Sequence, residues 1–172
     1  MTKSKSAQHI QNLQKRNIFI ASDHAGFELK EFIKNYFSNK GELLIDLGTD
    51  SNNSVDYADF AQNLCKKVLE CQSDNKKSFG ILVCGSGIGM SISANRFVGI
   101  RASLCLSAYM AHITRAHNDA NVLCLGARVS GEGEVESILE AFFSSEFEGG
   151  RHANRIAKIE CFATQSHTKP ND

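Results

Sequence analysis

The segment from Phe79 to Met90 joins an apolar strand to a helix through a loop of alternating glycines. The run FGILVC has the apolar composition and the length of a buried strand. The following GSGIG places glycine at every second position, where the backbone is free to adopt positive φ angles and to turn its N–H groups toward one point. A strand, a tight turn and a helix start in this order indicate an α/β domain.

Strands and helices alternate along the rest of the chain. The predicted strands are Ile18–Ala21, Leu43–Leu47, Phe79–Cys84, Gly99–Ser103 and Asn121–Leu125. Apolar residues recur at helical spacing in residues 29–37, 57–68, 88–95, 108–116 and 135–143, and more weakly in 151–162. Because this alternation implies right-handed βαβ crossovers, we expect a single Rossmann-like three-layer domain with a five-stranded parallel sheet.

The length of 172 residues suits one well-buried domain and is short for two. We expect a flexible extension at residues 1–17, the domain at 18–160 and a C-terminal tail at 161–172. No apolar run approaches the roughly 18 residues that a membrane span requires, and the N-terminus lacks the apolar core of a secretory signal. We therefore expect a cytoplasmic protein without a membrane partner.

The charges and cysteines exclude several classes of function. Nineteen basic side chains balance 19 acidic ones, so a broad nucleic-acid-binding face is not expected. The six cysteines are scattered and form no C-x-x-C pair, so the sequence predicts neither a zinc site nor a disulfide framework. We expect reduced thiols, no metal and no cofactor.

The glycine loop does not fit the common nucleotide-binding motifs. Its spacing is G-x-G-x-G, whereas the dinucleotide fingerprint requires G-x-G-x-x-G, and no acidic residue lies between Met90 and Asp119 to bind a ribose. No Gly-Lys-Ser/Thr follows, which excludes a Walker loop. The loop is therefore either a turn with close helix packing or a site for an anion.

Cys84 ends the strand immediately before this loop. The start of a helix favours a thiolate, so Cys84 can act as a proton-abstracting base while the adjacent amides hold the anion that forms. The alternative is that Cys84 is a small apolar side chain in the core.

Polar residues follow three of the predicted strands. Asp23 and His24 follow the first strand, Ser86 lies in the loop after the third, and Arg128 follows the fifth. In parallel sheets, ligands bind beyond the carboxyl ends of the strands, so these residues are expected at one binding edge.

A second group of polar residues is expected elsewhere. His117 and Asn118 lead into the fifth strand and so belong to the opposite edge; if they are functional, they serve a site in another subunit. Arg151 and Arg155 lie four apart on one helical face and can grip a phosphate together. The alternatives are a surface or capping histidine and a solvated helix face.

Taken together, the motifs resemble those of the type B ribose-5-phosphate isomerases, from about Ile18 to Ile159. The matching segments are DHAGF at 23–27, DY at 56–57, CGSGIG at 84–89, ANRF at 94–97, GIRA at 99–102, HND at 117–119 and GGRH at 149–152. Their order and spacing carry the resemblance, since each motif alone is weak.

The resemblance implies metal-free interconversion of ribose 5-phosphate and ribulose 5-phosphate through a cis-enediolate, a step of the non-oxidative pentose phosphate pathway. In this family the base is either a cysteine or a glutamate directly after the glycine loop, where this chain has Met90. Cys84 is thus the implied base and His117 opens the sugar ring. The implied substrate-binding residues are Asp23, His24, Gly85, Ser86, Gly87, Ile88, Gly89, Asn118, Arg128, Arg151 and Arg155.

The resemblance also implies a homodimer or a dimer of dimers with shared active sites, in which the C-terminal helix reaches a neighbouring subunit. Two alternatives stay open. One is a six-carbon sugar-phosphate isomerase, acting on galactose 6-phosphate or allose 6-phosphate. The other is a non-catalytic sugar-phosphate-binding module, which would need neither Cys84 nor His117.

Overall fold

The computed structural model describes residues 16–73 and 77–165. The predicted extension lies outside these residues except for Arg16 and Asn17, which open the first strand. The predicted tail lies within them only as far as Gln165. Among the described helices, none has both the length and the apolar character needed to cross a membrane.

Five parallel strands form one sheet in the order β2-β1-β3-β5-β4, which confirms the predicted α/β class. The strands are β1 (Arg16–Ser22), β2 (Ile45–Asp46), β3 (Lys77–Cys84), β4 (Ala102–Leu104) and β5 (Val122–Gly126). The apolar run that includes Cys84 is thus the central strand, and its carboxyl end lies between the ends of β1 and β5.

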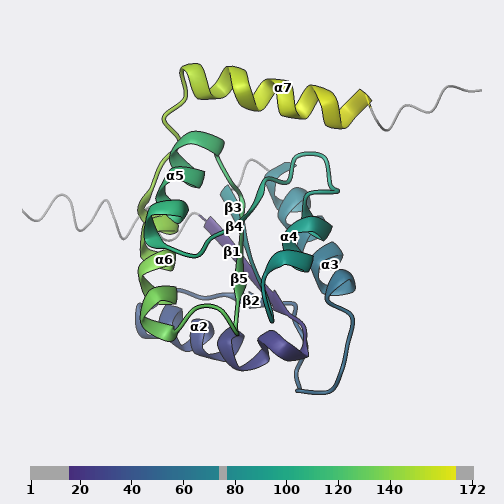
Figure 1. The fold of residues 1–172 in the computed structure, drawn as a ribbon, viewed down its shortest axis with the longest axis vertical. Helices are drawn as coiled ribbons and strands as arrows, with labels where there is room; N and C mark the ends of the chain where they lie inside the picture. Colours follow the sequence, from purple (N-terminus) through teal and green to yellow (C-terminus); the bar gives the residue numbers. More distant parts are fainter. Residues whose placement is uncertain (1–15, 74–76, 166–172) are drawn as a thin grey trace, which may run out of the picture.

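Helices cover both faces of the sheet and make the three predicted layers (Figure 1). One face carries α2 (Phe27–Asn39), α5 (Ala108–Asn118) and α6 (Glu132–Ser144). The other face carries α3 (Tyr57–Ser73) and α4 (Ile88–Ala94). A short 3-10 helix, η1 (His24–Gly26), connects β1 to α2.

The alternation of side chains along β1 explains the two cores. Ile18 and Ile20 pack under α2, α5 and α6, whereas Phe19 and Ala21 pack under α3 and α4, as the period of two in a strand requires. Cys84 belongs to the second core. Its sulfur therefore lies on the face of the sheet where α4 begins.

The two outer strands differ from their predicted ranges. At β2, Leu43 is 89% exposed and only Ile45 and Asp46 pair with β1, because this strand lies at an edge where few ladder partners exist. At β4, Gly99 adopts a φ of 86°, so the chain is still turning there and pairing begins only at Ala102.

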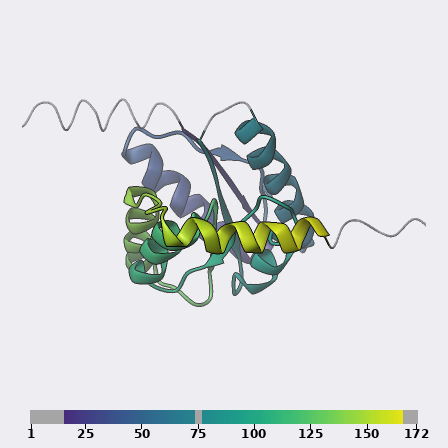
Figure 2. The same ribbon diagram turned by 90° about the horizontal axis from the view of Figure 1, so that it is seen from above.

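The last helix, α7 (Arg151–Gln165), lies apart from the two layers. It crosses one end of the sheet, passing from the side of α5 and α6 toward the side of α3 and α4 (Figure 2). Arg101 forms an ion pair of 2.9 Å with Glu160, and the backbone N–H of Gly99 donates to the same carboxylate at 3.3 Å. These contacts hold α7 to the amino ends of β4 and β5.

Candidate active site

Three loops meet where the parallel strands end. The Asp23 N–H donates to the carbonyl of Val83 at 3.3 Å, and the Arg128 N–H donates to the carbonyl of Gly85 at 2.9 Å. The carbonyl of Cys84 accepts from the Ala127 N–H at 2.8 Å. The structure thus brings the residues after β1, β3 and β5 to one edge, as the sequence predicted.

Cys84 is the most constrained of these residues. It is 5% exposed, and its Sγ accepts a hydrogen bond from the backbone N–H of Gly87 at 3.1 Å. Gly87 has a φ of 77° and precedes α4, a conformation that glycine adopts without strain. The N–H donor and the helix start both stabilise negative charge on this sulfur.

Burial disfavours the thiolate form of three other cysteines. Burial raises the pKa of Cys65 to about 12, and it also raises the pKa of Cys124 well above its ordinary value. Burial raises the pKa of Cys105 as well, although a hydrogen bond to Ser103 opposes this. These three thiols stay protonated at neutral pH, and Cys84 is the candidate base because its sulfur accepts the Gly87 N–H beside the glycine loop.

The glycine loop lies close against its neighbours. A side chain at Gly126 would come within 2.7 Å of the Ser86 backbone, and one at Gly89 within 2.7 Å of the Tyr57 ring. The Ser86 Oγ accepts from the Ile88 N–H at 3.3 Å. The backbone of Gly85–Gly89 therefore runs directly beside Cys84, between the loop after β5 and Tyr57.

Three further side chains border this edge. Asp23 is buried, and its Oδ1 accepts from the Gly26 N–H at 3.0 Å. The Nδ1 of His24 lies 3.2 Å from the Val55 N–H and 3.3 Å from the Val55 carbonyl oxygen, so Val55 fixes the position of this ring. The guanidinium of Arg128 lies over Gly85, 3.4 Å from the position of an added Cβ. Arg128 thus offers N–H donors beside the residue that follows Cys84.

The other predicted site residues lie at the opposite edge. His117 and Asn118 form the last turn of α5, just before β5 begins. The five residues of β5 rise about 3.3 Å each, so roughly 15 Å separates the two edges. Arg151 and Arg155 occupy the first two turns of α7, and both are exposed. One subunit alone does not bring these four residues to Cys84.

Two residues to which the sequence analysis gave no role lie beside His117. The rings of His117 and His152 stack with centroids 4.1 Å apart and planes 10° from parallel. The Glu148 Oε2 lies 3.6 Å from Nε2 of His117 and 3.7 Å from Nε2 of His152. In the sequence, the one nearby hint of this arrangement is that Glu148 and His152 are four residues apart, with two glycines between them.

This cluster has the residue types of a metal site but not the orientation. His117, Glu148 and His152 place their ligand atoms within 4.8 Å of one another. The lone pair of an imidazole lies in its ring plane. In two stacked rings with nearly parallel planes the lone pairs lie in two separate planes, so they do not converge on one ion as in tetrahedral zinc sites.

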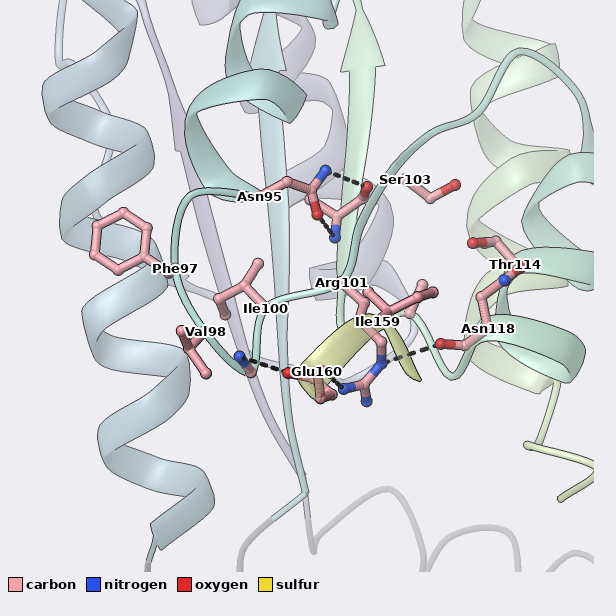
Figure 3. A pocket seen from close by; sticks show the side chains of 13 residues that line it. Asn95, Phe97, Val98, Ile100, Arg101, Ser103, Thr114, Asn118, Ile159 and Glu160 are labelled. Carbon is pink, nitrogen blue, oxygen red and sulfur yellow. Dashed lines mark hydrogen bonds and ion pairs between the residues drawn. The ribbon is translucent and has the colours of Figure 1, made fainter. Parts of the chain in front are cut away.

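A hollow of about 390 Å³ lies at the amino-terminal edge, beneath α7 (Figure 3). Asn118, Arg101 and Glu160 border it, and Arg101 Nε donates to the carbonyl of Asn118 at 3.0 Å. Cys84 is not among its lining residues. The hollow therefore lies at the edge of the sheet that carries His117, and not at the edge that carries Cys84.

Comparison with known proteins gives one family. Residues 18–159 match the family described as Ribose/Galactose Isomerase. Ribose-5-phosphate isomerase B of Escherichia coli is 40% identical over 144 residues, covering 84% of this chain and 94% of its own.

Solved structures agree with this match. Ribose 5-phosphate isomerase B from Thermotoga maritima is 51% identical, with a TM-score of 0.79 over 84% of this chain and 97% of its own. The enzyme from Mycoplasma genitalium, solved with bound ribulose-5-phosphate, is 40% identical, with a TM-score of 0.80 over 89% of this chain and 98% of its own. On its fold and on a match that spans nearly the whole domain, the chain belongs to the ribose/galactose isomerase family.

Proposed function

We propose that this protein interconverts ribose 5-phosphate and ribulose 5-phosphate, with Cys84 as the base that moves the proton. The observation that carries the proposal is the buried Cys84 sulfur, 3.1 Å from the Gly87 N–H beside the glycine loop. The relative from Mycoplasma genitalium with bound ribulose-5-phosphate supports this choice of substrate.

The chemistry requires a base and an anion site side by side. The Cys84 thiolate removes the proton from C2 of the open aldose, the C2–H electrons form the C1–C2 double bond, and the former carbonyl oxygen O1 takes the negative charge. The proton on O2 then moves to O1, the O2 electrons form the C2–O2 carbonyl, and the electrons of the C1–C2 double bond take the proton back from Cys84 at C1, which gives the ketose. N–H groups of Gly85–Gly89 and the Ser86 hydroxyl stabilise the enediolate, because donors aimed at the developing charge lower the barrier.

Ribose 5-phosphate is mainly a closed furanose, so the ring must open before this step. In the proposed mechanism His117 delivers a proton to the ring oxygen O4 as the C1–O4 bond breaks, while O1 releases its proton to water and the O1–H electrons form the C1 carbonyl. Asn118 and Asp23 orient the sugar hydroxyls. His24, Arg128, Arg151 and Arg155 hold the phosphate through charge-assisted hydrogen bonds.

A second subunit is needed to complete this site. Cys84 and His117 lie at opposite edges of the sheet, and a two-fold dimer would bring one subunit's α5 end and α7 to the partner's carboxyl edge. Apolar side chains around α4 and the start of α5 are exposed, as expected for a face that a second copy covers: Ile88, Ile92, Leu106, Tyr109 and Met110. We propose a homodimer, or a dimer of such dimers, with shared sites.

A substrate panel tests the proposed function. The purified protein is assayed with ribose 5-phosphate, galactose 6-phosphate and allose 6-phosphate. We expect turnover of the five-carbon substrate with the highest kcat/KM. Preference for a six-carbon sugar would overturn the choice of substrate. Binding of all three without turnover would indicate a non-catalytic module.

Arg155→Ala is expected to raise KM for ribose 5-phosphate about 10- to 100-fold with a smaller effect on kcat, because one charge-assisted contact to the phosphate is lost. Arg151→Ala should behave in the same way. Steady-state kinetics measure both effects, and Lys66→Ala, which removes an exposed cation on α3, is the control. A fall in kcat at unchanged KM would exclude a binding role for these arginines.

Treatment with EDTA is expected to leave the isomerisation rate unchanged, because the proposed mechanism uses a thiolate and backbone donors. The assay compares the enzyme before and after chelation and gel filtration. Activity that disappears and returns with a divalent cation would contradict the metal-free mechanism and would point to the cluster of His117, Glu148 and His152.

A further inference from the structure

The contact between His117 and His152 is close and nearly parallel, with centroids 4.1 Å apart and planes 10° from parallel. The two side chains differ in exposure, since the His152 side chain is 5% exposed and the His117 side chain 33%. A buried ring lying flat against a partly exposed one restricts the orientations open to the exposed ring. His152 therefore has the geometry of a support for His117.

The backbone builds this support from the turn before α7. The Glu148 N–H donates to the carbonyl of Ala116, in the last turn of α5, at 3.0 Å. Gly149 and Gly150 have φ angles of 67° and 54° with open space around them, so glycine is needed there for the backbone turn. The His152 N–H then donates to the carbonyl of Gly149 at 3.0 Å. This turn brings Glu148 and His152 to His117 together.

Burial and the charges around the stack both disfavour the protonated form of His152. Burial lowers the pKa of His152, and the charges of His117, Arg151 and Arg155 lower it further, while Glu148 opposes them. A neutral His152 ring presents its π face to His117 and does not repel a positive charge on the His117 ring. The Oε2 of Glu148 lies 3.6 Å from Nε2 of His117. The carboxylate can therefore hold the His117 ring through the hydrogen on Nε2. Both residues belong to the same subunit, so this contact is present before a second subunit completes the site.

We propose that Glu148 and His152 are positioning residues that fix the ring of His117 for opening the sugar. The inference rests on the proposed function and adds two residues to it. Neither is expected to touch the carbons that exchange protons, because the proton-transfer step belongs to Cys84 at the other edge. Their loss should therefore slow ring opening and leave proton transfer intact.

Two assays on the full-length enzyme separate these steps. Isomerisation of ribose 5-phosphate requires ring opening. Incorporation of deuterium at C1 of ribulose 5-phosphate, followed by NMR in D2O, requires only proton transfer, because the esterified C5 oxygen prevents this ketose from closing a furanose ring. The variants are His152→Ala, His152→Phe and Glu148→Gln. His112→Ala, on the same helix as His117 but hydrogen-bonded to Ser145, is the matched control.

We expect His152→Ala and Glu148→Gln to lower kcat for ribose 5-phosphate about tenfold, since small losses of alignment are costly in catalysis. Exchange into ribulose 5-phosphate should stay at the wild-type rate. His152→Phe should recover most of the loss because it restores a flat ring for stacking. His112→Ala should leave both assays unchanged.

Other results would overturn the inference. Equal loss of both activities, an unchanged kcat in both His152→Ala and Glu148→Gln, or a rise in KM alone would each exclude a positioning role in ring opening. If the His152 variants fail to fold, Glu148→Gln alone still tests the positioning role. A wild-type enzyme inactive in both assays would instead overturn the proposed function itself, and the inference with it.

Discussion

Replacing Cys84 with alanine is expected to lower kcat for isomerisation by at least about a thousandfold, because the change removes the proposed base of the proton transfer. Deuterium exchange at C1 of ribulose 5-phosphate should disappear with it. Alanine fits the space of the small buried thiol, so we expect a loss of stability of only about 1 kcal/mol and near-normal binding of ribose 5-phosphate.

The control for this variant is Cys161→Ala, which changes an exposed cysteine on α7. Thermal unfolding and circular dichroism establish that both variants fold, and calorimetric titration with ribose 5-phosphate measures binding. If folded Cys84→Ala keeps wild-type turnover, Cys84 is only a core residue and another group is the base.

His117→Ala is expected to reduce the rate from cyclic ribose 5-phosphate by about 100-fold or more, since it removes the acid that opens the ring. The enediolate step should survive. Deuterium should therefore still enter C1 of ribulose 5-phosphate at close to the wild-type rate, a pattern opposite to that of Cys84→Ala.

A pre-steady-state comparison makes this test independent of the overall equilibrium. The burst of product is measured with cyclic aldose and with the small open-chain fraction. Identical impairment of both forms would remove His117 from ring opening and would return it to a structural role at the end of α5.

The parallel sheet was predictable from the sequence because strand and helix periods alternate so regularly. The strand ends that carry Asp23, Cys84 and Arg128 were predictable for the same reason, since a parallel sheet sends all its carboxyl ends to one edge. The first residue of β4 was harder to predict, because the turn at Gly99 depends on a positive φ angle that the sequence pattern does not show. Tyr57, the first residue of the apolar pattern at 57–68, is 43% exposed, and its ring lies against Gly89.

The surroundings of His117 could not be predicted from local patterns. Glu148 and His152 are more than 30 residues from His117 in the chain, and only the turn at Gly149 and Gly150 brings them to it. Periodicity describes neighbours on one element, whereas this cluster joins the end of α5 to the start of α7. The position of His117 at the far edge from Cys84 was nevertheless predictable, because α5 leads into a parallel strand.

Because Cys84 and His117 lie at opposite edges of the sheet, the proposed mechanism depends on a site shared between two subunits. It is tested most directly by mixing two inactive proteins, Cys84→Ala and His117→Ala, after dissociation and reassembly. Each mixed dimer then contains one site with both residues intact, so an equimolar mixture should regain about a quarter of the wild-type activity. If native mass spectrometry shows that mixed dimers form and they remain inactive, the whole site lies within one subunit and the shared site is wrong.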